Sequence, residues 1–271
     1  MAISFVLAGG SSLAATQVGM LRALSEADIT PDFLIGTSAG GINAFCFARH
    51  PTAAGLDHLQ QLWCGLSRKQ VFPIDVVQIM AGLTGIRDGV VAPDKLRSFL
   101  NGHVGPAQLA DTTIPVHLMA TDLPNGQPVL LSDGPALDAL MASSAIPGVF
   151  PPVWRGNRPL VDGGVAADVP VHQAEELGST MTYVLPTVGP GNTATVPHGA
   201  VPILLHALSH LFGRAATNEI TAARHPVHVL PAPAHVSGNP FDFGATEALI
   251  EAGYRTATEA LATDLRDYAV A

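Results

Sequence analysis

Residues 32–49 read DFLIGTSAGGINAFCFAR, and this stretch decides the fold that the sequence predicts. The apolar run from Phe33 to Ile35 is typical of a short buried strand, and Ala39 to Arg49 fits a helix. Between them, Gly36 to Gly40 matches the pattern in which a serine occupies a tight strand-to-helix turn and small residues let the backbone close. We therefore expect Ser38 to stand exposed at the carboxyl end of the strand, as a nucleophile.

A second strand–loop–helix unit precedes this stretch. Ile3 to Ala8 predicts a buried strand, and Ala14 to Ser25 has the spacing of an amphipathic helix. Alternating strands and helices indicate a largely parallel sheet, whose strands end at one edge, so the intervening loop should lie beside Ser38. Glycines allow backbone amides to approach a reacting carbonyl group closely. The predicted donors to the oxyanion are the amides of Gly9, Gly10 and Ser11.

The same glycine-rich loop would also suit a dinucleotide-binding protein. A dinucleotide fingerprint centred on Gly10 would place glycines at the positions of Ala8 and Leu13. Two of its three glycines are therefore missing, and this reading is disfavoured.

A serine nucleophile needs a base, and the best candidate is Asp162. It follows the apolar pair Leu160 and Val161 and precedes Gly163 and Gly164, which predicts a carboxylate at a strand end. Burial would raise its pKa and make it a usable base near neutral pH. The alternative is an Asp-Gly turn with no chemistry.

Histidines are a weaker choice of base, although the chain has eleven. In the Ser-His-Asp α/β-hydrolases several strands precede the nucleophile, and here only one strand–helix unit does. A Ser38–Asp162 dyad is therefore favoured. His206 and His210 are spaced four apart on a predicted helix but lack the glutamate of the His-Glu-x-x-His zinc motif. We expect no metal and no cofactor.

Composition limits the partners. The formal net charge is −9, which disfavours nucleic acid and leaves any membrane contact to apolar residues, so we expect that contact to be weak. No run of about 20 apolar residues and no basic leader is present, and we expect a cytoplasmic protein. Hydrophobic residues make up 48% of the chain, enough for one large core. The sequence leaves the oligomeric state open.

The chain is expected to form one domain over residues 1–271. Residues 71–86 are apolar and include two glycines, and they could form a cap. The portion from about residue 189 onward carries no motif but contains predicted helices. One of these has an apolar face that either packs on the core or faces lipid, made of Leu204, Leu205, Leu208, Leu211 and Phe212.

Taken together, these motifs resemble the patatin-like phospholipases. The resemblance covers about two thirds of the chain and includes the glycine-rich loop, Gly36 to Gly41, and Asp162 to Gly164. Residues 142–152 and the segment Asp168-Val169-Pro170 are similar to the family's stretches around its aspartate. The resemblance implies a three-layer α/β/α fold with a mostly parallel sheet, a metal-independent acyl-enzyme route and hydrolysis of lipid acyl esters. It also implies nucleophile and base roles for Ser38 and Asp162, donor roles for Gly9, Gly10 and Ser11, and supporting roles for Gly36, Gly40, Gly163 and Gly164.

One departure from the family concerns the charge beside the loop. Where the family usually has Gly-Gly-Gly-x-Arg-Gly, this chain has residues 8–13, and Ser12 takes the place of the arginine. The loss of a cation favours a neutral ester over a phosphate-bearing head group. It also leaves open a second possibility, a catalytically silent member that binds a lipid or a protein.

Overall fold

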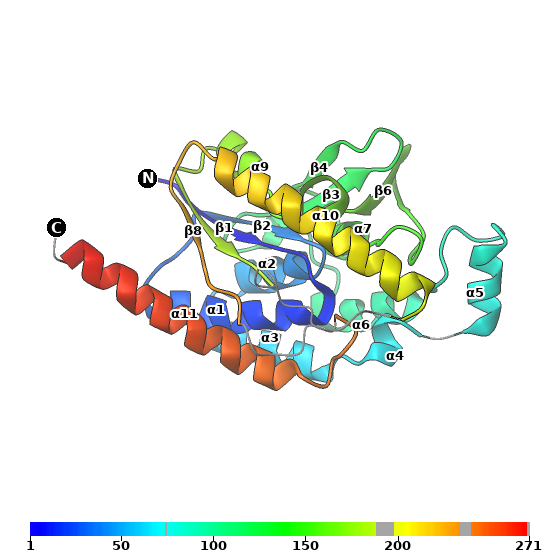
Figure 1. Cartoon of the computed structure of the whole chain (residues 1–271), viewed down its shortest axis with the longest axis horizontal. Coiled ribbons are helices and arrows are strands. Elements are labelled where there is room, and N and C mark those ends of the chain that lie inside the picture. The colour runs from blue at the N-terminus through cyan, green and yellow to red at the C-terminus, as the bar shows by residue number, and fades with distance from the viewer. Residues whose placement is uncertain (74, 188–197, 234–239, 270–271) are drawn as a thin grey trace.

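A central eight-stranded sheet lies between two layers of helices in the computed structural model, which describes residues 1–73, 75–187, 198–233 and 240–269 (Figure 1). The strand order is β5-β6-β3-β2-β1-β7-β8. Strand β4 is an additional strand that pairs antiparallel with β3. The strands are β1 (Ile3–Leu7), β2 (Phe33–Thr37), β3 (Val116–Asp122), β4 (Pro128–Leu131), β5 (Val153–Arg155), β6 (Arg158–Asp162), β7 (Met181–Leu185) and β8 (Val227–Val229).

The middle of the sheet is parallel and one edge is antiparallel. Strand β1 pairs in parallel with β2 and β7, and β2–β3 and β7–β8 are also parallel pairs. Strand β6 runs antiparallel to β3, and β5 runs antiparallel to β6. The predicted three-layer architecture with a mostly parallel sheet is confirmed. The sequence did not reveal β5, because three residues are too few to show a period.

Alternating side chains of β1 build both faces of the core. Phe5 and Leu7 belong to the larger apolar cluster, and Val6 and Ala8 belong to the smaller one. The larger cluster lies under one helical layer, which comprises α1 (Thr16–Glu26), α2 (Ala39–Arg49), α3 (Ala53–Gly65), α6 (Asp94–Val104), α7 (Ala136–Ser143) and α11 (Thr246–Ala269). The other face is covered by α9 (Val171–Glu176) and α10 (Ala200–Ala222), with α8 (Gly164–Ala167) beside them.

One short helix, α5 (Val76–Leu83), falls in the segment 71–86 predicted as a possible cap, and it stands away from the body at one end of the long axis (Figure 1). Helix α4 (Arg68–Val71) comes just before it and lies near α6. The role of α5 as a cap stays a prediction. Part of the predicted C-terminal portion, residues 188–197, lies outside the described residues, as do the side chains of Leu205 and Leu208. Across the described ranges, no helix has the length and apolar character needed to span a membrane.

The closest helix contact in the fold is between α1 and α11. A Cβ atom at Gly19 would lie 2.1 Å from the carbonyl oxygen of Ile250 and 2.4 Å from the amide nitrogen of Tyr254. At Gly253 it would lie 2.2 Å from the carbonyl oxygen of Thr16. The two glycines therefore let the backbones of the helices touch, and this contact ties the C-terminal helix to the start of the chain.

We expect Gly19→Ala to lower the free energy of unfolding by roughly 2–3 kcal/mol, because the added methyl group overlaps backbone atoms that cannot rotate away. Chemical denaturation measures the effect. Gly102→Ala is the matched control in α6, where a Cβ atom would meet nothing within 4 Å. That change should be neutral or stabilising by up to about 1 kcal/mol. Equal effects of the two substitutions would contradict the proposed helix contact.

Candidate active site

Ser38 occupies a strained turn between β2 and α2. Its φ of 53° and ψ of −123° lie where residues with a side chain are rarely found. A Cβ atom at Gly36 would lie 2.5 Å from the Cα of Gly41, and one at Gly40 would lie 2.4 Å from the Leu7 carbonyl oxygen. The turn thus needs glycine on both sides of Ser38, as the sequence pattern predicts.

A buried serine fixes the orientation of this turn. The Ser38 amide donates to Oγ of Ser143, at 2.9 Å, and the Ser38 carbonyl oxygen accepts from the Gly41 amide, also at 2.9 Å. Ser143 is fully buried at the end of α7. This contact could not be predicted from the sequence, because the two serines are more than one hundred residues apart.

The strand registers bring the predicted residues to one level of the sheet. Leu7 is paired with Gly36, Thr37 with Met119, and Ala120 with Asp162. Continuing these registers by one or two residues places four residues in one row across the sheet: Gly9, Ser38, Ala120 and Asp162. The glycine-rich loop, the serine and the aspartate therefore lie together, as predicted from the order of elements.

Asp162 lies at the end of β6, where only 5% of it is exposed. Its amide donates to the Ala145 carbonyl oxygen at 2.9 Å, and its Oδ1 accepts from the Gly164 amide at 2.8 Å. Burial raises the pKa of this carboxyl to about 7, although hydrogen bonds from the Ser38 side chain and the Gly164 amide oppose the rise, and the nearby Asp168 charge adds to it. The Ser38 side chain and the Asp162 carboxyl are therefore neighbours in the site.

Gly163 and Gly164 are required by close neighbours on two sides. A Cβ atom at Gly163 would lie 2.3 Å from the Met119 carbonyl oxygen of β3. At Gly164 it would lie 3.2 Å from Oδ1 of Asp162 and 3.4 Å from the Phe212 ring of α10. Helix α10 therefore passes over the site, with Phe212 beside the aspartate.

A second carboxyl group, that of Asp168, contacts the glycine-rich loop. Its Oδ1 accepts a hydrogen bond from the Gly9 amide at 3.0 Å, and Thr187 Oγ1 donates to the Gly9 carbonyl oxygen at 2.7 Å. Desolvation by its surroundings raises the pKa of Asp168 to about 6. The sequence marked Asp168 only as part of a motif, and it gave no indication of this contact.

The glycine-rich loop also carries the amides of Gly10 and Ser11. Within the part of the chain that the structure describes, the amides of Gly10 and Ser11 have no acceptor. Ser11 has a φ of 53°, which turns the loop sharply at this point. Ser12, which stands in place of the family arginine, is fully buried and its amide donates to the Pro240 carbonyl oxygen at 3.3 Å.

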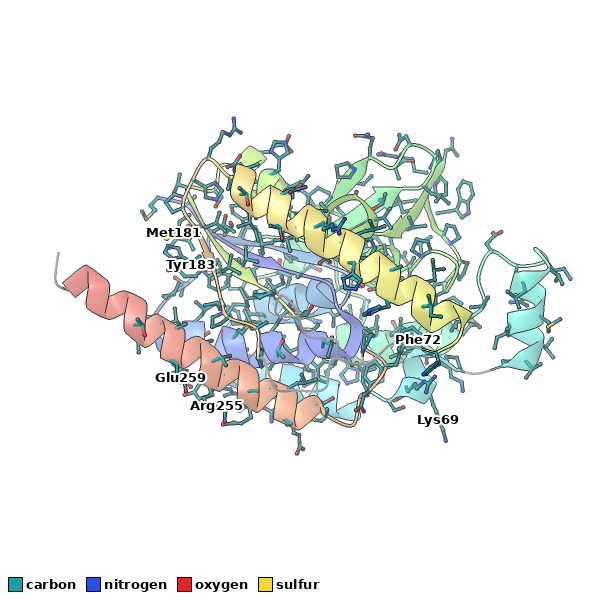
Figure 2. All side chains as sticks on the ribbon, viewed as in Figure 1. Lys69, Phe72, Met181, Tyr183, Arg255 and Glu259 are labelled. Atoms are coloured by element: carbon teal, nitrogen blue, oxygen red, sulfur yellow. The ribbon has the colours of Figure 1, made fainter. Side chains whose placement is uncertain are left out.

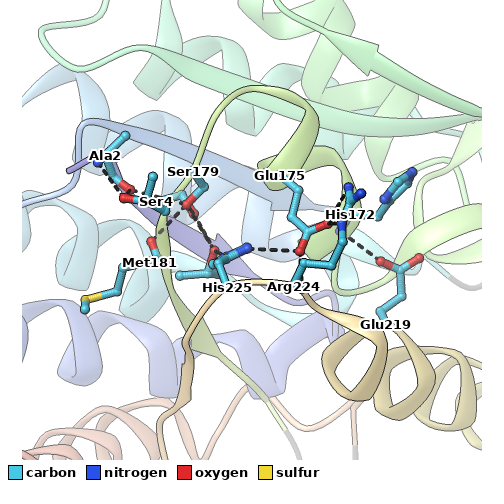
Figure 3. Close-up of polar contacts among 11 residues, drawn as sticks. Ala2, Ser4, His172, Glu175, Ser179, Met181, Glu219, Arg224 and His225 are labelled. Atoms are coloured by element: carbon cyan, nitrogen blue, oxygen red, sulfur yellow. Dashed lines mark hydrogen bonds and ion pairs between the residues drawn. The ribbon is translucent and has the colours of Figure 1, made fainter.

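A histidine hydrogen-bonded to a carboxylate occurs at the other end of the sheet (Figure 3). His225 lies 3.1 Å from Oε1 of Glu175 through Nδ1 and 2.6 Å from Oγ1 of Thr182 through Nε2. Thr182 also contacts Ser4, and both are fully buried near the amino ends of β7 and β1. This network lies away from Ser38 and supports the chain just after α10.

No described histidine hydrogen-bonds to Ser38 or Asp162. On α10, the Nε2 atoms of His206 and His210 are 3.3 Å apart. Among the residues described, no group of three or more His, Cys, Asp or Glu side chains is placed to hold a metal ion.

These features define a class of protein: an α/β/α protein with a serine at a strained strand–helix turn beside a buried aspartate. A family model described as patatin-like phospholipase matches residues 5–175. The chain belongs to the patatin-like phospholipase family, and the resemblance seen in the sequence is confirmed. Named relatives in this family include a patatin-like phospholipase domain-containing protein and a lysophospholipase.

The relatives are distant and mostly longer. The uncharacterized NTE family protein Rv1063c of Mycobacterium tuberculosis is 26% identical over 183 residues, which cover 68% of this chain and 48% of that protein. Patatin-like phospholipase domain-containing protein 7 of Rattus norvegicus is 25% identical over 68% of this chain and 13% of its own length. The crystal structure of VipD from Legionella pneumophila aligns with 97% of this chain and 67% of that one, at 13% identity and a TM-score of 0.58. The likeness to VipD shows the fold alone.

Proposed function

We propose that this protein is a serine acyl hydrolase that cleaves carboxylic ester bonds of lipid-like substrates. Ser38 at its strained turn and the buried Asp162 lie in one row across the sheet, and this placement is the main support for the proposal. A serine hydroxyl becomes a useful nucleophile only when a neighbouring base accepts its proton. Burial supplies that base, because it raises the pKa of Asp162 to about 7.

The reaction proceeds in two halves. In the first, Asp162 accepts the proton of Ser38, Oγ forms a bond to the acyl carbon, and the proton passes to the leaving alcohol as its C–O bond breaks. In the second, Asp162 accepts a proton from water, the hydroxide attacks the acyl-enzyme, and the proton returns to Ser38 as the acid leaves. No metal or organic cofactor enters either half.

The oxyanion formed in each half needs preorganised donors. The amides of Gly10 and Ser11 stand in the loop whose first residue, Gly9, lies in the row of Ser38, and they have no acceptor among the described residues. The Gly9 amide can join them when it leaves Asp168. Such donors commonly contribute about 3–4 kcal/mol each to transition-state stabilisation.

The charges around the site favour a neutral ester. The carboxyls of Asp162 and Asp168 both lie at the reacting centre, and the position of the family arginine is the buried Ser12. A phosphate placed close to the loop would be repelled by these carboxylates and would gain no charge-assisted hydrogen bond from residue 12. The proposed substrate class is therefore an acyl ester whose charged groups, if any, lie away from the scissile bond.

The competing proposal is a silent member of the fold that binds a lipid without cleaving it. The missing arginine is the observation that favours it. A silent scaffold keeps the fold but has no activated serine, so the two proposals differ in reactivity at Ser38.

Labelling with a fluorophosphonate probe should modify Ser38 stoichiometrically, because this probe reacts with activated serine hydroxyls. Peptide mass spectrometry locates the label. Ser38→Ala and Asp162→Asn should each lower ester hydrolysis by about a thousandfold or more, and the double variant should be no worse. Ser25→Ala, on α1 and away from the site, is the control and should react like the wild type. Absence of labelling in folded protein would favour the silent scaffold.

The pH dependence of kcat/KM should show an acidic limb that flattens near pH 7, because only the deprotonated form of Asp162 accepts the Ser38 proton. Asp168→Asn should move this limb to lower pH. It removes the negative charge that raises the pKa of Asp162, while its side-chain oxygen still accepts from the Gly9 amide.

Asp28→Asn is the matched control for this shift. Asp28 is an exposed residue with a φ of 56°, which asparagine tolerates, and its loss of charge should leave the limb in place. A limb that stayed unchanged in Asp168→Asn would show that Asp168 does not act on the base.

A further inference from the structure

Helix α5 exposes large apolar side chains. None of its residues is buried, and Val77 and Leu83 are 76% and 70% exposed. Ile86, just after the helix, is 78% exposed. Surface helices normally turn such side chains toward the protein, so this helix departs from the usual arrangement.

The small residues of α5 face the protein instead. A Cβ atom at Gly82 would lie 2.7 Å from the Gly89 carbonyl oxygen and 2.9 Å from Cγ1 of Val90. On a helix, positions 76, 80 and 83 share one side, and position 82 lies on another. The helix therefore contacts the body through glycine and presents Val76, Met80 and Leu83 outward.

The helix is well formed despite this exposure. Oδ1 of Asp75 accepts from the amides of Val77 and Gln78, at 2.9 and 3.3 Å, and so caps its start. At its end, the Thr84 amide and hydroxyl both donate to the Met80 carbonyl oxygen. A capped helix with an apolar outer face is suited to an apolar environment on that side.

Both ends of this segment are attached to the region that leads to the active site. Before α5, Phe72, labelled in Figure 2, stacks on Phe150 at a ring distance of 5.9 Å. After it, the amides of Val90 and Val91 donate to the carbonyl oxygens of Gly148 and Val149. Gly148 and Val149 lie shortly before β5, which pairs with β6, the strand that carries Asp162.

Helix α10 adds apolar side chains near the same end of the molecule. Its N-terminal end lies toward the end of the long axis where α5 projects (Figure 1). Ile203, Leu204 and Leu211 are exposed on it, and Phe212 lies against the position of Gly164 in the site. Exposed apolar side chains thus occur both on α5 and on the helix that passes over the candidate active site.

The charged residues beside α5 indicate which kind of partner this surface binds. Residues 68–88 contain three basic residues, Arg68, Lys69 and Arg87, and two acidic ones, whereas the whole chain has a formal charge of −9. One of the two acids, Asp75, is engaged in capping the helix. Apolar side chains flanked by exposed basic residues match the hydrocarbon boundary and the head groups of a lipid bilayer.

We propose that this docking surface, made of the outer face of α5, Ile86 and the exposed Ile203, Leu204 and Leu211 of α10, binds the surface of a lipid bilayer. The choice of lipid as partner rests on the proposed function, because a lipid ester hydrolase draws its substrate from such a surface. Docking would bring α10, which passes over the site, next to the acyl esters of the membrane.

Vesicle flotation tests the proposal without catalysis when it is done in full-length protein carrying Ser38→Ala. The probes are vesicles of phosphatidylcholine alone and of phosphatidylcholine with an equal amount of phosphatidylglycerol. Leu83→Asp should lower the partition coefficient about tenfold, and Met80→Asp combined with Leu83→Asp should lower it further. Leu177→Asp makes the same change at an exposed leucine beyond α9 and should leave binding unchanged.

Three outcomes would overturn the proposal. They are wild-type vesicle binding in Leu83→Asp, no vesicle binding by the parent protein, and a parent dimer that Leu83→Asp converts to a monomer, which would identify a second copy as the occupant. With Ser38 restored, Leu83→Asp should keep kcat/KM for a soluble short-chain ester and lose hydrolysis of vesicle lipid. Vesicle binding together with no hydrolysis of any ester would refute the proposed function and leave the docking surface standing.

Discussion

The close approach of α2 to β1 is the constraint on which the rest of the site depends. Gly40 lies so near the carbonyl oxygens of Leu7 and Ala8 that a single added carbon would collide with both. This contact forces the sharp turn at Ser38 and holds its backbone at a positive φ. It also brings the turn against the glycine-rich loop, and a Cβ atom at Gly9 would be 3.3 Å from that of Ser38. A strained nucleophile and its neighbouring amides are therefore consequences of one packing contact.

Electrostatics then distinguishes this site from an ordinary packed turn. Two carboxyl groups lie close together in a largely desolvated region, and burial raises the pKa of both Asp162 and Asp168. A folded state with raised carboxyl pKa values binds more protons than the unfolded chain. These two groups therefore destabilise the fold as the pH rises from the ordinary aspartate pKa of 3.8 through about 6 and 7. The protein tolerates this loss of folding stability at the place where the Asp162 carboxyl lies next to the Ser38 side chain. The same environment that opposes the charge makes the carboxylate a stronger base.

Much of this arrangement was accessible from the sequence, because its elements are local. The turn at Ser38, the loop at Gly9 and the strand before Asp162 each follow from a few adjacent residues, and the family and the fold they indicated are confirmed. The catalytic roles of these residues remain predictions. The contacts of Ser143 with Ser38 and of Asp168 with Gly9 were not accessible, since they join segments separated by more than one hundred residues. The outward apolar face of α5 was also missed, because periodicity shows that a helix has a face but does not show which way it points.

Burial is proposed to make Asp162 the base for Ser38. The pH at which this single carboxyl loses its proton is therefore the quantity to measure. Difference infrared spectroscopy of wild type against Asp162→Asn, followed across pH, isolates the carbonyl stretch of the protonated Asp162 side chain. If Asp162 is the base, this band should disappear with a midpoint near pH 7. A band already lost near pH 4, the ordinary range of an exposed aspartate, would contradict it.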